Sequence, residues 1–527
     1  MKIIKKIRIK NFKSLEDVEI EFKTLTFLFG PNGSGKSSFM KALLFFYKNV
    51  FPVNNSQTQY KLSSELDLGS FDECVINGDR KKDIEFEFTI EHKIRFPDKR
   101  LFDIENYPDY LESKEKESSD FWNVKEYINS LNSNFFEEYS RIENLNDPYY
   151  AEFIDKYSSD YKFSYNVIFL FKYNELGKNL FSIHIKDNSN ENSIEYNIQD
   201  NSSAIFNLKD NNEYLQHLLN SCFKNNFCGD HDFPFINKNE FIEGELLPFI
   251  IKIEKENKIL REWLSLDIEK RLEIYYDLIK FTYTAIELIP KFFTYSLELF
   301  HMPIIREIPK PKYLLINNKF NSDEYYGFLD NLYKSNTKVN GIKVNYISNN
   351  INELLKIIGI DKKLNLYINK DIGYIYFYHK SKKKINLANE SSGLIQILPI
   401  LISLCIKPKY PFIMIEQPEL HLHPKLQSRL ADVFIKSLND RNEPNTIMIE
   451  THSEHLIRKI QVLIANGELS REKVSVLYFD NNQGLTKIKE MEIDENGLFK
   501  EDWPNGFFDD SVNLTMELFD AIRKRKN

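Results

Sequence analysis

The sequence predicts an α/β fold whose main sheet is open and largely parallel, with an added antiparallel β-subdomain. A glycine-rich octapeptide, GPNGSGKS, lies between an apolar strand and an amphipathic helix. Two more short apolar strands, at 412–415 and 446–449, each end in polar residues. Apolar and polar residues alternate at 84–90, as in a sheet with one solvated face. In open α/β sheets ligands bind at the carboxyl ends of the parallel strands, so we expect the functional site there.

The octapeptide matches the phosphate-loop pattern G-x-x-x-x-G-K-[ST] in the context that the pattern requires, strand before and helix after. Backbone N–H groups and the helix dipole of such a loop face the phosphates of a nucleoside triphosphate. Lys36 is expected to reach the β- and γ-phosphates, and Ser37 to hold Mg²⁺. The expected nucleotide-binding residues are Gly30, Asn32, Gly33, Ser34, Gly35, Lys36, Ser37 and Ser38.

Length and composition predict a large globular protein of two or three lobes. The chain has 527 residues, of which 42% are hydrophobic, and a formal net charge of −8. Its four cysteines form no disulfide pattern, and no apolar run approaches the ~20 residues that span a bilayer. We therefore expect a cytoplasmic protein without a membrane span. The acidic balance neither requires nor excludes DNA as a partner.

Three regions are expected along the chain. Residues 1–97 carry strands at 3–9, 18–22 and 25–29 and the phosphate loop. Residues 98–300 form an α+β insertion, a possible partner-docking region, with antiparallel strands near 167–173, 181–185 and 194–198 and a helical pattern over 237–300. Residues 301–527 supply the second half of the site.

An acidic cluster follows the strand at 412–415. Glu416 is the expected magnesium-side carboxylate, because a carboxylate at such a strand end can bind the ion through water. Gln417 stands where a catalytic base would be expected, and Glu419 lies two residues further on. The alternative interpretation is an ionic cluster at a strand end.

Two other features point to the same site. His452 follows the strand at 446–449 and is expected to sense the γ-phosphate, although a capping or packing histidine would look alike. Ser392 and Gly393 open an apolar helix, as an anion-binding helix start or an ordinary N-cap does. The basic clusters at 382–384 and 523–526 are candidate phosphate contacts, or a solvated hairpin tip and a frayed tail.

Together these segments resemble the ABC-type ATPase heads of the SMC and OLD branch, in particular bacterial AAA-family proteins. The resemblance rests on KIRIKNFKSLEDVEIEF, GPNGSGKSS, DLGSF, IEQPELHLHP, ETHSEHLI and WPNGFFDD. It implies that ESSGLIQ stands at the ABC signature, so that Ser392 and Gly393 contact the γ-phosphate held by a partner subunit. A head-to-head homodimer, or a higher even-numbered homo-oligomer, with ATP and Mg²⁺ between the heads would follow.

The sequence also departs from that family. Gln417 replaces the usual catalytic glutamate, which predicts slow hydrolysis or the use of Glu419. No glutamine fits the Q-loop between Asp67 and Lys93, and about 75 residues after His452 are too few for a nuclease domain of typical ~100–150 residues. Cys222, Cys228 and His231 lack a fourth zinc ligand at proper spacing.

Three functions remain open. The resemblance implies a defence ATPase of bacterial anti-phage systems such as Septu, in which a separate effector, a nuclease, does the destructive chemistry. An SMC-like protein that clamps DNA on head closure is the main alternative. A third is an ATP-binding scaffold without turnover, suggested by Gln417.

Overall fold

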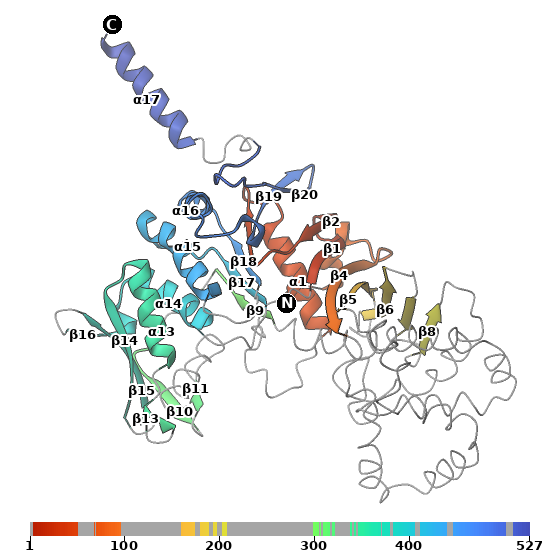
Figure 1. Ribbon diagram of the computed structural model, residues 1–527, viewed down its shortest axis with the longest axis horizontal. Coiled ribbons are helices and arrows are strands. Elements are labelled where there is room, and N and C mark those ends of the chain that lie inside the picture. Colours follow the sequence, from red (N-terminus) through yellow and green to blue (C-terminus); the bar gives the residue numbers. More distant parts are fainter. Residues whose placement is uncertain are drawn as a thin grey trace, which may run out of the picture.

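The structure contains three larger β-sheets and a set of helices around them (Figure 1). This computed structural model describes residues 4–50, 68, 70–95, 160–173, 180–188, 193–197, 203–207, 299–304, 306, 309–316, 319–321, 338–339, 342–343, 346–369, 372–379, 383–405, 412–439, 446–501 and 510–526.

The central sheet has six strands in the order β20-β19-β3-β18-β17-β9. They are β3 (Leu25–Phe29), β9 (Leu299–Met302), β17 (Phe412–Glu416), β18 (Thr446–Glu450), β19 (Val474–Asn482) and β20 (Leu485–Glu490). All neighbours are parallel except β19 and β20, which form an antiparallel hairpin. This is the predicted open, mainly parallel sheet, and it brings together strands that lie more than 400 residues apart in the chain.

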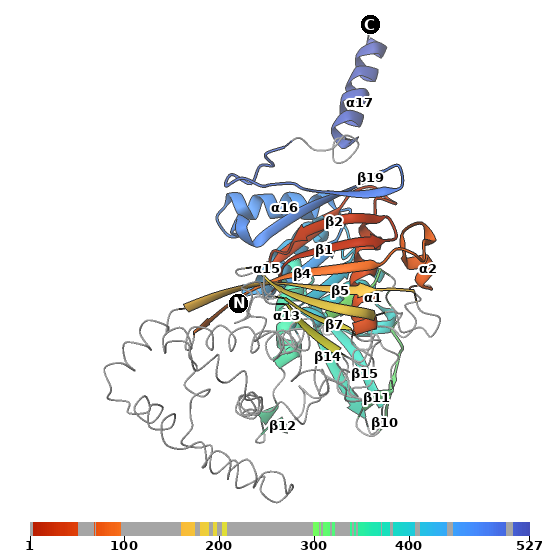
Figure 2. The same ribbon diagram turned by 90° about the vertical axis from the view of Figure 1, so that its right-hand side faces the viewer.

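A seven-stranded antiparallel sheet, in the order β2-β1-β4-β5-β6-β7-β8, lies beside the central sheet (Figure 2). Its strands are β1 (Ile4–Phe12), β2 (Leu15–Glu21), β4 (Ile84–Arg95), β5 (Asp160–Phe171), β6 (Leu180–Asp187), β7 (Ser193–Asn197) and β8 (Ser203–Asn207). Helix α1 (Lys36–Val50) follows the phosphate loop, and α2 (Phe71–Cys74) is a single turn before β4.

The other described strands and α-helices belong to the C-terminal half of the chain. A five-stranded sheet contains β10 (Tyr313–Ile316), β11 (Lys319–Asn321), β14 (Lys362–Asn369), β15 (Ile372–His379) and β16 (Lys384–Asn386), and β12 (Lys338–Val339) pairs with β13 (Ile342–Lys343). The helices are α13 (Tyr346–Ile358), α14 (Ser392–Cys405), α15 (Pro424–Asn439), α16 (Glu454–Ala465) and α17 (Asp510–Lys526). Helix α17 stands away from the other elements in both views (Figures 1 and 2).

Both faces of the central sheet are buried, which explains why its strands are almost continuously apolar. Leu28 on β3 belongs to the core shared with α1 and the antiparallel sheet. Its neighbours Phe27 and Phe29 point the other way, into the core formed with helices α13 to α16. The phosphate loop is therefore anchored by a strand that is packed on two sides.

Most predicted elements are confirmed where the structure describes them. The strands expected near 167–173, 181–185 and 194–198 are β5, β6 and β7, and β5 pairs with β4 along its whole length. Part of the expected insertion 98–300 thus continues the sheet that residues 1–97 begin. The stretches 98–159 and 237–298, the zinc candidates Cys222, Cys228 and His231, and most of WPNGFFDD lie outside the described residues.

Two local predictions differ from the structure. The helical pattern was expected to reach residue 300, but Leu299 and Phe300 begin β9, because their backbone pairs in parallel with β17. The basic cluster at 523–526 was expected as a frayed tail, yet it forms the last turn of α17. Apolar residues at 514, 518 and 522, four apart, favour that helix.

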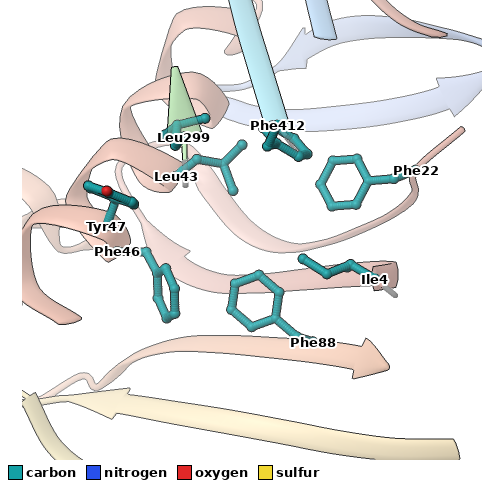
Figure 3. A pocket seen from close by; sticks show the side chains of 8 residues that line it. All are labelled: Ile4, Phe22, Leu43, Phe46, Tyr47, Phe88, Leu299 and Phe412. Atoms are coloured by element: carbon teal, nitrogen blue, oxygen red, sulfur yellow. The ribbon is translucent and has the colours of Figure 1, made fainter. Parts of the chain in front are cut away.

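Aromatic rings fill the core between α1 and the antiparallel sheet. The ring of Phe46 lies 4.7 Å from that of Phe88, 4.7 Å from that of Phe169 and 5.3 Å from that of Phe86, measured between centroids. An apolar cavity of about 20 Å³ borders this cluster, between Phe46, Phe88 and Phe412 (Figure 3). It is hardly larger than one water molecule and offers no polar partner, so it is a packing gap.

Replacing Phe46 by alanine should destabilise this half of the protein. The side chain is 2% exposed, and its loss removes ring contacts and enlarges the existing gap. We expect a loss of about 3–5 kcal/mol in the free energy of unfolding, measured by denaturant titration. The matched change Phe519→Ala, at a position 64% exposed on α17, should cost about 0.5 kcal/mol or less. Equal effects of the two changes would contradict the packing described.

Candidate functional site

The carboxyl ends of β3, β18 and β17 meet at one edge of the central sheet. Glu450, the last residue of β18, is in register with Glu416 on β17 and with Leu28 on β3. The backbone extends this alignment past the strands, because the N–H of Gln417 donates to the carbonyl of Glu450 at 2.8 Å. The phosphate loop after β3 and the polar residues after β17 and β18 are thus neighbours, as the sequence predicts.

At two positions of the phosphate loop, neighbouring atoms leave no room for a side chain, so glycine is required. A Cβ atom on Gly30 would lie 2.2 Å from the carbonyl oxygen of Phe479, and one on Gly35 would lie 1.9 Å from Oγ1 of Thr486. Both residues have positive φ angles, 143° and 104°, that side chains disfavour. The loop therefore presses against β19 and β20, which fix its shape.

A cleft of about 170 Å³ lies over this loop. It is lined by Asn32, Gly33, Ser34, Gly35, Lys36, Ser37, Ser38, Gln417, Glu450 and His452. Seven of the eight residues expected to bind the nucleotide at the phosphate loop line it, and the eighth, Gly30, accepts a hydrogen bond through its carbonyl from Nζ of Lys36 at 2.9 Å. The same ammonium donates to the carbonyl of Pro31, and burial lowers the pKa of Lys36, opposed by the charge of Glu450.

Glu450 is a site residue that sequence reasoning missed. Its side chain is 2% exposed, and its Oε1 accepts a hydrogen bond from the hydroxyl of Ser37 at 3.3 Å. Burial, together with the charge of Glu416, raises the pKa of Glu450 to about 7. Its Oε2 is buried without a hydrogen-bond partner in the described part of the chain. A carboxylate oxygen beside a serine hydroxyl and a lysine fits a hard divalent cation and the phosphates that it neutralises.

Glu416, the expected magnesium-side carboxylate, is bound by residues of β9 and the segment after it. Oε1 contacts Nε2 of His301 on β9 at 2.8 Å, and the N–H of Ile304 donates to Oε2 at 3.4 Å. Nη2 of Arg306 donates to the carbonyls of Glu416 and Gln417 at 2.7 and 3.4 Å. His301 and Arg306 therefore fix the position of the strand end, and Glu450 lies between Glu416 and the phosphate loop.

The other predicted catalytic residues differ in their surroundings. Gln417 lines the cleft with a φ of 42°, a left-handed conformation that is uncommon for a residue with a side chain. Glu419 is 8% exposed and accepts a hydrogen bond from the backbone N–H of His452 at 2.7 Å. Burial raises the pKa of Glu419. The structure thus places Glu419 behind His452 and outside the residues that line the cleft.

His452, two residues after the end of β18, also lines the cleft. Burial, and then the charge of Lys36, lowers the pKa of its imidazole, which favours the neutral form. The neutral ring can accept one hydrogen bond and donate another. Ser453 next to it caps α16 by accepting from the N–H of Leu456 at 3.2 Å, so the turn that carries His452 is fixed on both sides.

Ser392 and Gly393 begin α14 and are not among the residues that line this cleft. Ser392 is exposed, and a Cβ on Gly393 would lie 3.0 Å from the carbonyl oxygen of His421. The helix start is therefore packed closely against the turn that follows β17, with its first hydroxyl at the surface.

No cluster of three or more His, Cys, Asp or Glu side chains suited to a metal ion occurs among the described residues. The only metal position that the sequence predicts there is the one at Ser37 and Glu416. None of the described helices is both long and apolar enough to cross a membrane.

Two family models and a curated relative match parts of this chain. Residues 1–457 match the family described as AAA ATPase domain, and residues 469–518 match one described as a protein of unknown function (DUF3696). Over 50 residues the chain is 36% identical to an OLD nuclease of Thermus scotoductus, a match that spans 10% of this chain and 10% of that protein.

Solved head domains of SMC proteins are also similar. One from Pyrococcus furiosus, with an extended coiled coil and bound to the C-terminal domain of ScpA, has 12% identity and a TM-score of 0.36, with coverage of 99% of this chain and 100% of that chain. The SMC head domain of Thermotoga maritima has 11% identity and a TM-score of 0.35, with coverage of 93% and 100%.

The first family match spans most of the chain, so the protein belongs to the AAA ATPase domain family. Its fold is the predicted α/β ABC-type ATPase head, in which a mainly parallel sheet is combined with an antiparallel β-subdomain.

The pKa of Glu450 predicts a pH-dependent gain of stability in Glu450→Gln. Between pH 4.5 and about 7, Glu450 keeps its proton in the folded protein but loses it in the unfolded chain. Its contribution therefore lowers the free energy of unfolding as the pH rises through this range, and this loss is constant above about pH 7. Without nucleotide and metal, the variant should be more stable than the parent by on the order of 2 kcal/mol at pH 8, and by much less at pH 5.

Denaturant titrations at the two pH values measure this difference. The matched control is Glu495→Gln, at an exposed position, which should change stability little at either pH. A variant that is less stable than the parent at pH 8 would show that the buried carboxylate stabilises the metal-free fold.

Proposed function

We propose that this protein binds ATP with Mg²⁺ in the cleft over Ser37 and hydrolyses it. The observation that carries the proposal is the contact between Ser37 and Glu450, which lie 413 positions apart in the chain and meet in a cleft that also contains Lys36. The loop is suited to phosphates, and the buried carboxylate is suited to a divalent cation. Their contact is best explained by a ligand that contains both, which is a nucleoside triphosphate with its metal ion.

Different residues of this chain would bind the phosphates and the Mg²⁺ ion. The loop N–H groups and the ammonium of Lys36 would hold the phosphates, with Lys36 exchanging the loop carbonyls for phosphate oxygens. Ser37 and Glu450 would hold Mg²⁺ directly, and Glu416, tied to His301, would act on it through water. When bound, Mg²⁺ supplies positive charge to the β- and γ-phosphate oxygens.

The attacking water would be oriented by Gln417 and His452, which both line the cleft. A glutamine cannot accept a proton as a carboxylate does, which predicts slow turnover. Glu419 supports this arrangement from behind by holding the N–H of His452. It is therefore proposed as a positioning residue, and the earlier alternative of a base at Glu419 is less favoured by the geometry.

The wider role is proposed from the resemblance to defence ATPases. Two chains would pair head to head, so that the exposed helix start at Ser392 and Gly393 of one chain meets the nucleotide in the cleft of the other. ATP-dependent closure would then regulate a separate effector, a nuclease, in anti-phage defence. The exposure of Ser392 at this helix start supports a contact with a second copy.

Lys36→Ala tests the enzymatic proposal. Loss of the ammonium removes the main positive charge of the loop, so phosphate release from ATP and Mg²⁺ should fall by about 100-fold or more, roughly 3 kcal/mol in transition-state stabilisation. Lys41→Ala, an exposed position on the same helix, should retain the parental rate. An unchanged rate in Lys36→Ala would mean that the phosphate loop does not carry the activity.

A further inference from the structure

The five-stranded sheet presents a row of tyrosines to solvent. The tyrosine face, as we call it, consists of Tyr367 on β14, Tyr374, Tyr376 and Tyr378 on β15, and the lysines Lys363 on β14 and Lys384 on β16. Cross-strand register places these side chains together: Tyr367 is opposite Tyr374, Lys363 is opposite Tyr378, and Tyr378 is also opposite Lys384. Tyr367 is 51% exposed and Tyr378 is 37% exposed.

On the opposite side of the same strands, apolar side chains are packed. Leu364, Ile375 and Phe377 are buried in the core that also contains residues of α13. Buried apolar side chains thus alternate along these strands with the tyrosines and lysines of the tyrosine face. This sheet lies at the lower left of Figure 1, with α13 beside it.

Three rings of the tyrosine face, those of Tyr367, Tyr374 and Tyr376, lie next to one another. The centroids of Tyr367 and Tyr374 are 6.4 Å apart, and those of Tyr374 and Tyr376 are 6.0 Å apart with an angle of 18° between the ring planes. The ammonium of Lys384 lies 3.7 Å from the centroid of Tyr376 and 5.0 Å from that of Tyr367. A positive charge is thus held directly on an aromatic surface.

The face is positive although the chain is acidic overall. The described strand residues that share it are Leu314, Lys363, Asn365, Tyr367, Ile372, Tyr374, Tyr376, Tyr378, Lys384 and Asn386, and none of these carries a carboxylate. The whole chain has a net charge of −8, so the charge of this face is opposite in sign to that of the chain. Its ligand should therefore combine negative charge with flat π-systems.

We propose that the tyrosine face binds single-stranded nucleic acid, with unpaired bases stacked on the tyrosine rings and backbone phosphates at Lys363 and Lys384. Aromatic stacking platforms lined with positive charge bind single strands in this way, without reading sequence. A duplex fits less well, because its bases are already stacked and paired. This site is separate from the ATP cleft and does not depend on hydrolysis.

The experiment is fluorescence anisotropy of labelled oligothymidine of about 20 nucleotides with the full chain. The test variants are Tyr376→Ala, Tyr367→Ala and Lys384→Glu. Two controls are matched to them: Tyr376→Phe keeps the ring, and Lys487→Glu reverses an exposed charge on β20. Thermal unfolding of each variant shows whether the sheet remains folded.

We expect saturable binding that weakens as salt is raised, because phosphate contacts release counterions. Each test variant should weaken it about 10-fold or more, whereas both controls should stay within about twofold of the parent. Absence of binding by the parent, or equal binding by parent and folded test variants, would overturn the proposal. So would variants that lose self-association in sedimentation while keeping the oligonucleotide, since the face would then be a protein interface. The proposal does not depend on ATP hydrolysis, so an unchanged rate of phosphate release in Lys36→Ala would not contradict it.

Discussion

The contact between the Ser37 hydroxyl and the Glu450 carboxylate is the constraint on which the site depends. It joins the first residues of α1 to the last residue of β18, and so closes the two halves of the chain around one cleft. A carboxylate buried there with one unpartnered oxygen, within the described part of the structure, lowers stability in the absence of a cation. The fold tolerates this cost because β3 and β18 are packed on both faces.

Backbone strain occurs at the same edge of the sheet. Gln417 has a left-handed backbone, and the glycines of the phosphate loop press against β19 and β20. The surrounding contacts hold these conformations in place: Arg306 donates to the carbonyl of Glu416 at the end of β17, and Glu419 accepts from the N–H of His452. Such concentration of strain and buried charge is typical of sites prepared for a ligand rather than for stability alone.

The sequence predicted the parts of the fold and site that depend on local pattern. The phosphate loop, the strands at 412–415 and 446–449 and the antiparallel strands up to residue 198 follow from periodicity and turn chemistry, and the structure contains them. Glu450, His301 and Arg306 were missed because their roles arise from strand order: β18 lies between β3 and β17, and β9 lies beyond β17. Glu450 could have been found from the sequence, because it is a carboxylate at the end of an apolar strand, as Glu416 is at the end of the preceding apolar strand. The three-region division of the chain stays a prediction, although β5 to β8 extend the first region's sheet.

Binding of Mn²⁺ to the ATP complex tests most directly whether Glu450 completes the metal site. Mn²⁺ replaces Mg²⁺ among oxygen ligands and is followed as the free ion by electron paramagnetic resonance. The account predicts that Glu450→Gln binds ATP without metal at least as well as the parent, but binds Mn²⁺ in the ATP complex about 10-fold more weakly, roughly 1.4 kcal/mol. Equal Mn²⁺ affinity in the two proteins would contradict it.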